Sequence, residues 1–380
     1  MSVIGHEVLF LKPGPDNPRN SEGAFLRLAD GSIMYAYSRY HGNSWSDFGD
    51  AEIYAIFSRD EGETWGEGRT LIRKNLEDTN LMSVSLLRMA NGDVGLFFLR
   101  KTGDFDCRLN FVRSSDEGNT WSEPICCVPE PGYYVTNNDR VIMLKSGRII
   151  FPGNYHETLP CSDFKDPHKA FNPVSTGHFY VSDDDGKSFR KTGSFISLPF
   201  SRTNTGLQET GLLELAPNVL WAWSRTCHGF QFESFSTNGG ETWGEVNPNQ
   251  FFSGPDSPMC VKRLLDGRIL AIFNPIPNYT GREKYISWGR TPLVCAVAGT
   301  SNGNTPLICA TSGASSSNSA PEFGNLKAIE DDPRYGYCYT AIHPEQDYIL
   351  LAYCCGFEGH QTLQGLKIKK IHIYELDEEQ

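Results

Sequence analysis

The chain has 380 residues with 34 Lys plus Arg and 46 Asp plus Glu, which gives a formal net charge of −12. This charge argues against a nucleic-acid partner, because phosphate binding needs a basic surface. Hydrophobic residues make up 39% and charged residues 21%, a globular composition, and no apolar run approaches the ~18 residues of a membrane span.

The 11 cysteines are an odd count for a disulfide framework, and two pairs are adjacent, at 126–127 and 354–355. No Cys-x-x-Cys pair is followed by a second pair or by histidines, so we expect neither a metal site nor a cofactor. Residues 1–12 lack the basic region and apolar core of a signal peptide. We therefore expect reduced thiols in a cytoplasmic protein, and the sequence leaves the oligomeric state open.

In chain order, the first predicted strand is the apolar segment 7–11. A hairpin pattern then recurs, with an apolar residue, a turn such as Asp-Gly or Asn-Gly, and a β-rich run. Asp-Gly and Asn-Gly are the strongest short hairpin signals. The copies lie at 28–35, 89–94, 144–149, 215–220, 265–269 and 342–349.

A second pattern, Ser-x-Asp-x-Gly-x-Thr-Trp, alternates with the first at intervals of about sixty residues. Ser and Asp side chains bond to nearby backbone, Gly supplies a positive φ, and Trp closes over the turn. Each copy follows an apolar stretch that is typical of a strand. The copies lie at 58–65, 114–121, 182–189 and 236–243, with a worn copy at 299–305.

Together the two patterns predict an all-β fold, a six-bladed β-propeller in which residues 1–380 form a single domain. No segment shows a long helical period with caps. The alternating segment 366–374 is the predicted late strand of the last blade, and 7–11 its missing edge strand, which would close the ring. The inserts 154–176 and 312–319 do not form separate domains.

Propeller topology places both turn series on one rim. The starts of the first strands and the connections from second to third strands then share the opposite rim, where loops converge on the axis. Several arginines fall there, and arginine forks bind carboxylates, so we expect an anionic ligand. The predicted substrate-binding residues are Arg19, Arg39, Arg100, Asn138, Asp139, Arg225 and Arg290.

The same rim carries candidates for catalysis. Asp47 or Asp50, in a connection rich in Gly and Ser, can protonate a leaving oxygen. Glu209 lies three blades away, near Tyr339, and a tyrosine beside a carboxylate base can act as a phenoxide nucleophile that an anionic sugar does not repel. The alternatives to this tyrosine on the same segment are Tyr335 and Tyr337.

The Ser-x-Asp-x-Gly-x-Thr-Trp repeats resemble the Asp boxes of the sialidase (neuraminidase) superfamily, and they cover most of the chain. The chain is most similar to bacterial sialidase-family or BNR-repeat proteins. The segments that carry this resemblance are 19–23, 82–87, 137–141, 208–209, 290–293 and 337–341.

The resemblance implies an exo-acting retaining glycoside hydrolase that removes a terminal sialic acid or related acidic sugar from an oligosaccharide or glycoconjugate. It implies that Glu209 is the catalytic glutamate, Tyr339 the nucleophile and Asp47 the acid/base. It also implies that Arg225 and Arg290 are the second and third members of an arginine triad.

Two alternatives stay open. The family's Arg-Ile-Pro segment is absent, so the first triad arginine is either Arg19 or Arg39. Arg100, Arg108 and Asp139 are polar groups beyond those of an ordinary sialidase, and they suggest another sugar acid. The protein would then be a uronate glycosidase, a polysaccharide lyase or a non-catalytic glycan-binding propeller.

Overall fold

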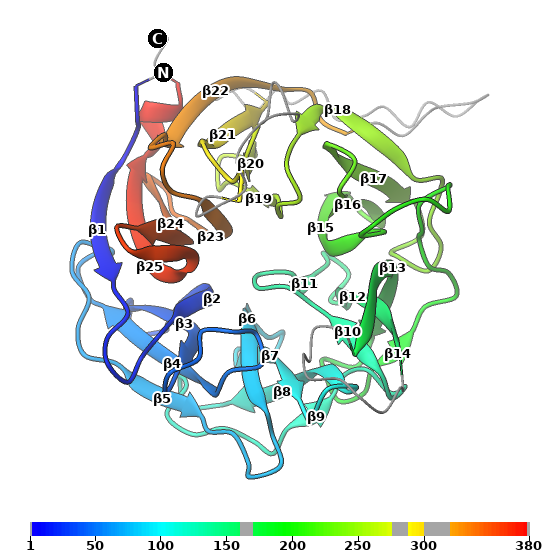
Figure 1. The fold of residues 1–380 in the computed structure, drawn as a ribbon, viewed down its shortest axis with the longest axis horizontal. Coiled ribbons are helices and arrows are strands. Elements are labelled where there is room, and N and C mark those ends of the chain that lie inside the picture. The colour runs from blue at the N-terminus through cyan, green and yellow to red at the C-terminus, as the bar shows by residue number, and fades with distance from the viewer. Residues whose placement is uncertain (1, 160–169, 276–287, 300–319, 378–380) are drawn as a thin grey trace.

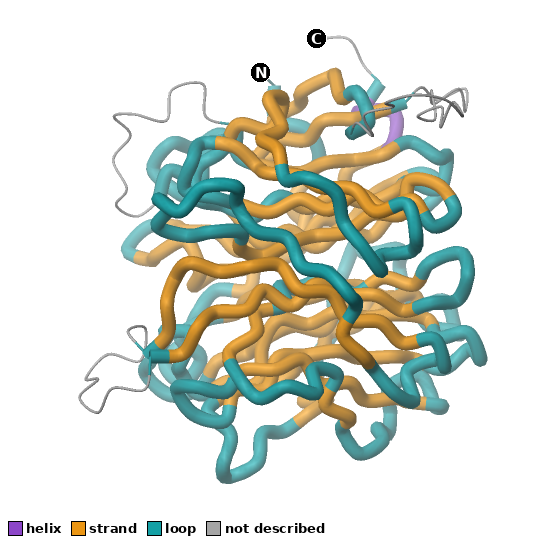
Figure 2. The backbone as a smooth tube through the Cα atoms, turned by 90° about the vertical axis from the view of Figure 1, so that its right-hand side faces the viewer, coloured by secondary structure: helices purple, strands orange, loops and turns teal. Residues whose placement is uncertain are grey.

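The structure, a computed structural model, describes residues 2–159, 170–275, 288–299 and 320–377. Its sheets surround a common centre (Figure 1), and in the side view the strands fill the middle while loops gather at the two faces (Figure 2). The fold is a single-domain, all-β propeller. Among the described residues the helix assigned is the 3-10 segment η2 (Ile373–Leu376).

Four of the sheets have four strands each. The first is β2 (Asn20–Arg27), β3 (Ile33–Tyr40), β4 (Ala51–Ser58) and β5 (Arg69–Ile72). The second is β15 (Gln208–Ala216), β16 (Val219–Arg225), β17 (Phe230–Ser236) and β18 (Asn247–Ser253). The third is β19 (Cys260–Arg263), β20 (Ile269–Phe273), β21 (Leu293–Ala298) and β22 (Phe323–Glu330). The fourth is β1 (His6–Leu11), β25 (His360–His372), β24 (Tyr348–Phe357) and β23 (Tyr337–Pro344).

The remaining strands form one nine-stranded sheet, which corrects the predicted count of six separate blades. β10 pairs antiparallel with β12 and, at Tyr133, parallel with β8, so it joins two repeat units. Tyr133 and Tyr134 are buried in the core of this sheet, which fixes β10 there. The strands are β6 (Asn80–Arg88), β7 (Val94–Lys101), β8 (Cys107–Ser114), β9 (Ile125–Cys126), β10 (Tyr133–Val135), β11 (Ile142–Met143), β12 (Ile149–Thr158), β13 (Phe171–Ser182) and β14 (Arg190–Lys191).

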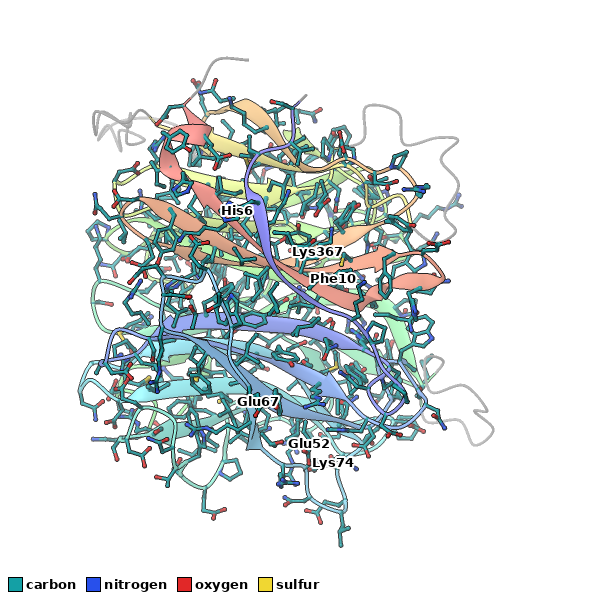
Figure 3. The ribbon with its side chains drawn as sticks, turned by 90° about the vertical axis from the view of Figure 1, so that its left-hand side faces the viewer. His6, Phe10, Glu52, Glu67, Lys74 and Lys367 are labelled. Carbon is teal, nitrogen blue, oxygen red and sulfur yellow. The ribbon has the colours of Figure 1, made fainter. Side chains whose placement is uncertain are left out.

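The two ends of the chain meet in one sheet. β1 pairs antiparallel with β25, with Phe10 opposite Lys367 and His6 opposite Lys370. Figure 3 shows β1 crossing the outer side of this sheet with Phe10 beside Lys367, whose ammonium lies 5.5 Å from the ring centroid. Pairing of the first strand with the last covers an edge that would otherwise expose unpaired backbone groups.

The hydrophobic core is divided among the contacts between neighbouring sheets. One cluster joins β2–β5 to β6–β8, another joins β15–β18 to β19–β22, and a third joins β19–β22 to β23–β25. A further cluster joins β23–β25 back to β2–β4. Burial of these apolar faces holds each sheet against the next and keeps the centre of the ring for polar side chains.

The Ser-x-Asp turns follow β4, β8, β13 and β17, with Asn238 in place of Asp in the last copy. All four share the hydrogen bonds that the Ser and the Asp or Asn side chains accept from backbone amides, whereas the indole bond to a glycine carbonyl is made by Trp65 and Trp243. In the first copy, Oγ of Ser58 donates to Asp60 (2.8 Å) and accepts from the amide of Gly62 (2.9 Å). The amide of Thr64 donates to the Asp60 carboxylate (2.9 Å), and the indole of Trp65 donates to the carbonyl of Gly62 (3.1 Å). Gly62 has a φ of 83°, which favours glycine.

Some sequence predictions fall outside the described residues. They are most of the worn repeat at 299–305, the serine-rich segment 312–319 and the middle of the insert 154–176. Among the described residues, no helix is long and apolar enough to cross a membrane.

Candidate active site

The predicted catalytic side chains surround a cavity of about 150 Å³ at the centre of the ring. It lies on the rim opposite the Ser-x-Asp turns, at the starts of the innermost strands. Its polar lining comes from widely separated parts of the chain. The polar residues that line it include Glu22, Asp47, Ser83, Glu209, Arg225 and Tyr339.

A left-handed backbone residue in several repeats aims a side chain at the centre. Glu22, Ser83, Glu209 and Tyr339 have φ between 50° and 58°. Each sits where the pairing register of β2, β6, β15 or β23 shifts, which is a β-bulge. A bulge re-aims a side chain, and a non-glycine residue at positive φ is strained, as is common at functional sites.

Tyr339, Glu209 and Arg225 form one hydrogen-bonded unit. The Tyr339 hydroxyl donates to Oε1 of Glu209 at 2.9 Å, and Nη1 of Arg225 donates to the Tyr339 oxygen at 3.3 Å. The same Nη1 lies 3.0 Å from Oε2 of Glu209. The phenol is therefore held between a proton acceptor and a cation, the arrangement that an activated tyrosine nucleophile needs.

Burial sets the resting charge of this unit. Tyr339 is 8% exposed, and burial raises its pKa well above the ordinary value, with the negative charge of Glu209 adding to the rise while Arg225 opposes it. The phenol is therefore protonated at rest. Burial disfavours the charged Arg225, but Glu209 and Asp256 outweigh it and raise the pKa of this guanidinium.

Asp47 lies on the cavity wall with Arg19 behind it. Nη1 of Arg19 donates to Asp47 at 2.6 Å, and the side chain of Asp47 is 42% exposed while that of Arg19 is 0% exposed. Lys101 and Asn80 donate to the backbone carbonyl of Asp47 and hold its connection in place. Asp50, the alternative, does not line the cavity and lies 3.6 Å from Lys74.

Arg290 stands behind the tyrosine. Its guanidinium lies over the rings of Trp288 and Tyr339, 5.3 and 5.5 Å from their centroids. It donates to the backbone carbonyl of Asp256 (2.9 Å) and to Sγ of Cys338 (3.1 Å). The structure thus brings Arg290 to the site, but as a support for Tyr339 rather than as part of the cavity wall.

The other predicted binding residues lie away from the cavity wall. The guanidinium of Arg39 lies over the ring of Tyr54, and Arg100 pairs with Asp78 (2.7 Å) and Glu77. Both arginines lie near strand ends on the cavity rim, as predicted, but their side chains contact these partners instead of the cavity.

Asn138 and Asp139 serve the backbone around the site. Nδ2 of Asn138 donates to the carbonyls of Gly23 (2.9 Å) and Tyr339 (3.2 Å), so it ties two bulged strands together. Asp139 pairs with Lys262 at 2.6 Å and accepts from the amide of Ile342.

Glu22 is a cavity residue that the sequence analysis did not predict. It is 4% exposed, accepts from Ser83 Oγ (3.1 Å) and from Nη2 of Arg19 (3.3 Å), and faces the cavity. The sequence does contain a pattern that could have identified Glu22. It precedes the apolar run of β2 in the same way that Glu209 precedes the apolar run of β15.

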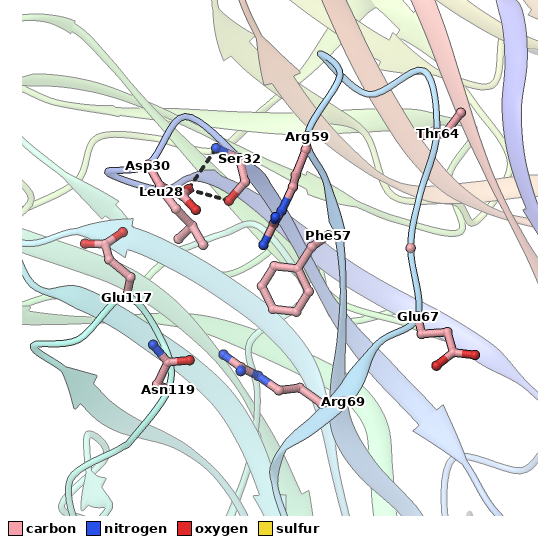
Figure 4. Close-up of a pocket in the computed structure, with 11 residues that line it drawn as sticks. Leu28, Asp30, Ser32, Phe57, Arg59, Thr64, Glu67, Arg69, Glu117 and Asn119 are labelled. Carbon is pink, nitrogen blue, oxygen red and sulfur yellow. Dashed lines mark hydrogen bonds between the residues drawn. The ribbon is translucent and has the colours of Figure 1, made fainter.

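A larger cavity of about 560 Å³ opens on the rim of the turns (Figure 4). Arg59, Arg69 and Glu117 line it, and Asp30 there accepts from the amide and hydroxyl of Ser32. None of the predicted site residues reaches it. Among the described residues, no group of three or more His, Cys, Asp or Glu side chains is arranged to hold a metal ion.

The BNR repeat-like domain model matches residues 37–350, most of the chain. The chain belongs to this family. This confirms the resemblance on which the sequence analysis rested, and no curated protein matches the sequence significantly.

Solved structures share the fold at low identity. The NanB sialidase from Streptococcus pneumoniae is 13% identical, with a TM-score of 0.69 over 99% of this chain and 71% of that chain. The intramolecular trans-sialidase from Ruminococcus gnavus is 14% identical, with a TM-score of 0.71 over 99% of both chains. A protein of unknown function from Dyadobacter fermentans is 17% identical, with a TM-score of 0.67 over 96% of this chain and 99% of that chain. The chain therefore has a sialidase-like fold.

Proposed function

We propose that this protein is an exo-acting retaining glycoside hydrolase that removes a terminal acidic sugar, sialic acid or a relative, from an oligosaccharide or glycoconjugate. The observation that carries the proposal is the unit of Tyr339, Glu209 and Arg225 facing the same cavity as Asp47. The neighbours named as sialidases support the class of reaction.

The geometry supports a two-step mechanism. In the first step Glu209 takes the proton of Tyr339, the phenol oxygen bonds to the anomeric carbon, and Asp47 protonates the leaving oxygen. In the second step Asp47 takes a proton from water, the water oxygen replaces the phenol oxygen at the anomeric carbon, and Glu209 returns its proton to Tyr339. Arg225 stabilises the phenoxide and meets the carboxylate of the sugar.

The first test is Tyr339→Phe with a fluorogenic sialoside. Loss of the hydroxyl should lower turnover by about 10³-fold, because the nucleophile is lost and Glu209 has no phenol proton to accept. Tyr335→Phe, on the segment before β23, is the matched control and should keep wild-type turnover. Unchanged turnover by Tyr339→Phe would exclude the tyrosine mechanism.

One observation favours a second candidate, an enzyme for another acidic sugar. Arg19 is fully buried and already contacts Asp47, Glu22, Ser21 and the carbonyl of Trp45, and Arg290 lies behind Tyr339. Arg225 therefore faces the ligand alone, without the open cluster of three guanidiniums that the resemblance implies. A uronate glycosidase or a lyase would not require that cluster.

Substrate assays separate these alternatives. A uronate glycosidase would release uronic acid and leave sialosides intact, and a lyase would form an unsaturated product that absorbs in the ultraviolet. A binding protein would retain its ligand affinity in Glu209→Gln and Asp47→Asn and form no product. The cytoplasmic location stays a prediction, which fractionation of the source cells would test.

A further inference from the structure

Arg19 is shared by two carboxyl groups. Nη1 donates to Asp47 at 2.6 Å, and Nη2 lies 3.3 Å from Oε1 of Glu22. The arginine side chain is 0% exposed, the Glu22 side chain 5%, and the Asp47 side chain 42%. One buried cation therefore faces an inner and an outer carboxyl at the same cavity wall.

The charges of this group do not balance when both carboxyls are ionised. Arg19 supplies one positive charge to the group, and ionisation of Glu22 would add a second negative charge at a side chain that is only 5% exposed. Such a charge is costly away from water, and two carboxyls at one site avoid it by retaining a proton. Ser83 Oγ donates to Oε2 of Glu22 and leaves Oε1 toward Arg19.

The backbone conformation of Glu22 directs its side chain to the cavity. It lies at a φ of 50° in the bulge of β2, as Glu209 does in the bulge of β15. A glutamate gains nothing from this conformation by itself, since the left-handed region is strained for residues other than glycine. The two bulges place Glu22 beside the Ser83 hydroxyl and Glu209 beside the Tyr339 hydroxyl.

We propose that Glu22 is a positioning residue that acts with Asp47 as one coupled acid, in which the two carboxyls share Arg19 and hold one proton between them. The coupling is electrostatic, because Arg19 keeps its own protons. When Asp47 gives its proton to a leaving oxygen, both carboxyls become ionised, and the proton of the attacking water restores the pair. The role of Asp47 rests on the proposed function, while the shared proton does not.

The titratable groups around Glu22 favour retention of one proton by Glu22 and Asp47 near neutral pH. Burial, with the charges of Asp47 and Glu209 adding to it and that of Arg19 opposing it, raises the pKa of Glu22 to about 7. Lys101, Arg225 and His156 line the same cavity as Glu22, and burial lowers the pKa of His156 to about 4. Burial raises the pKa of the phenols and thiols around Glu22, so they stay neutral in this range. They are Tyr35, Tyr40, Tyr339, Cys338 and Cys354.

A thermodynamic cycle tests the coupling without any substrate. Unfolding free energy is measured by denaturant at several pH values between 5 and 8 for wild type, Glu22→Gln, Asp47→Asn and the double variant. The folded pKa of Glu22 lies above its ordinary value of 4.5. The folded state therefore holds a proton that the unfolded state releases, and stability should fall as the pH rises toward 7.

In Glu22→Gln the unfolding free energy should no longer decrease between pH 5 and 7. In Asp47→Asn the decrease should be complete at a pH lower than in wild type by about one unit or more. In the double variant the effect of Asp47→Asn on the pH dependence should vanish. Glu233→Gln is the matched control, since Glu233 is a half-buried glutamate outside the cavity whose carboxylate accepts hydrogen bonds from Trp221 and Asn249. The effect of Asp47→Asn should be unchanged in that background.

A pH dependence that Glu22→Gln leaves intact, or that Asp47→Asn does not move, would overturn the proposal. Should Glu22→Gln fail to fold, Ser83→Ala replaces it. The Ser83 hydroxyl lowers the pKa of Glu22, so its loss should move the end of the fall to higher pH. No movement in that variant would also overturn the proposal.

Turnover provides a separate readout. With a fluorogenic sialoside or uronide, Glu22→Gln should lower kcat about tenfold more at pH 7 than at pH 5, with KM nearly constant. Equal losses at both pH values would mean that Glu22 does not act through Asp47. If no sugar acid is turned over, the proposed function fails, and the unfolding cycle still decides whether the carboxyls are coupled.

Discussion

The two rims of this propeller shift the pKa of their carboxyl groups in opposite directions. On the turn rim, hydrogen bonds from Thr64 and Thr120 lower the pKa of Asp60 and Asp116 to about 2. On the cavity rim, burial raises the pKa of Glu22 to about 7. The first environment keeps a carboxylate charged and holds a turn, while the second favours the protonated carboxyl. The degree of burial and the number of hydrogen-bond donors account for the opposite directions of these pKa shifts.

The largest effect on stability should come from the arginine of the cavity rim. Arg19→Ala leaves Glu22 and Asp47 without their cation, and breaking a buried ion pair costs about 3–5 kcal/mol. Arg334→Ala is the control, since the Arg334 side chain is 73% exposed beside Asp332 and its loss should barely change the unfolding free energy. Denaturant unfolding measures both, and similar losses would contradict the contrast between buried and exposed pairs.

A smaller effect is expected for the turn serine. Ser58 Oγ is buried and both donates to Asp60 and accepts from Gly62, so Ser58→Ala should cost about 1–2 kcal/mol of unfolding free energy without altering turnover. Ser83→Ala, on the other rim, should alter turnover as well. If Ser58→Ala changed the pH profile of turnover, the separation of the two rims would be wrong.

The smallest effect concerns the acid stability of the turns. Asp60 has a folded pKa of about 2, below its ordinary value of 3.8. Its contribution to stability is therefore present above about pH 4 and lost as the pH falls toward 2. The stability difference between wild type and Asp60→Asn should shrink over this range in acid unfolding experiments. A constant difference would show that the turn does not depend on the charge.

The turns were predictable because their pattern is local. Ser58, Asp60 and Gly62 contact one another within five residues, so the sequence alone carries the interaction. The joining of two blades by β10 was not predictable, since three residues give no strand signal and their pairing depends on burial of Tyr133 and Tyr134. Local patterns therefore predicted the propeller but not the number of separate sheets.

The site was predictable to the extent that topology places strand ends on one rim. Glu209, Tyr339 and Arg225 were named from this argument and lie together. Arg39 and Arg100 satisfy the same rule, but each turns to an outer partner that lies on another segment or strand. The contacts of Arg19 with Glu22 and Asp47 likewise could not be predicted from a local sequence pattern.

The central claim is that Tyr339 forms a bond to an acidic sugar. It is tested most directly by quenching the protein during reaction with a panel of sialosides and uronides and mapping its peptides by mass spectrometry. The account predicts one added glycosyl unit on the peptide that contains Tyr339, absent from Tyr339→Phe and accumulating in Asp47→Asn with a good leaving group. Turnover of any of these sugars by Tyr339→Phe at the wild-type rate, or an adduct on a different residue, would contradict it.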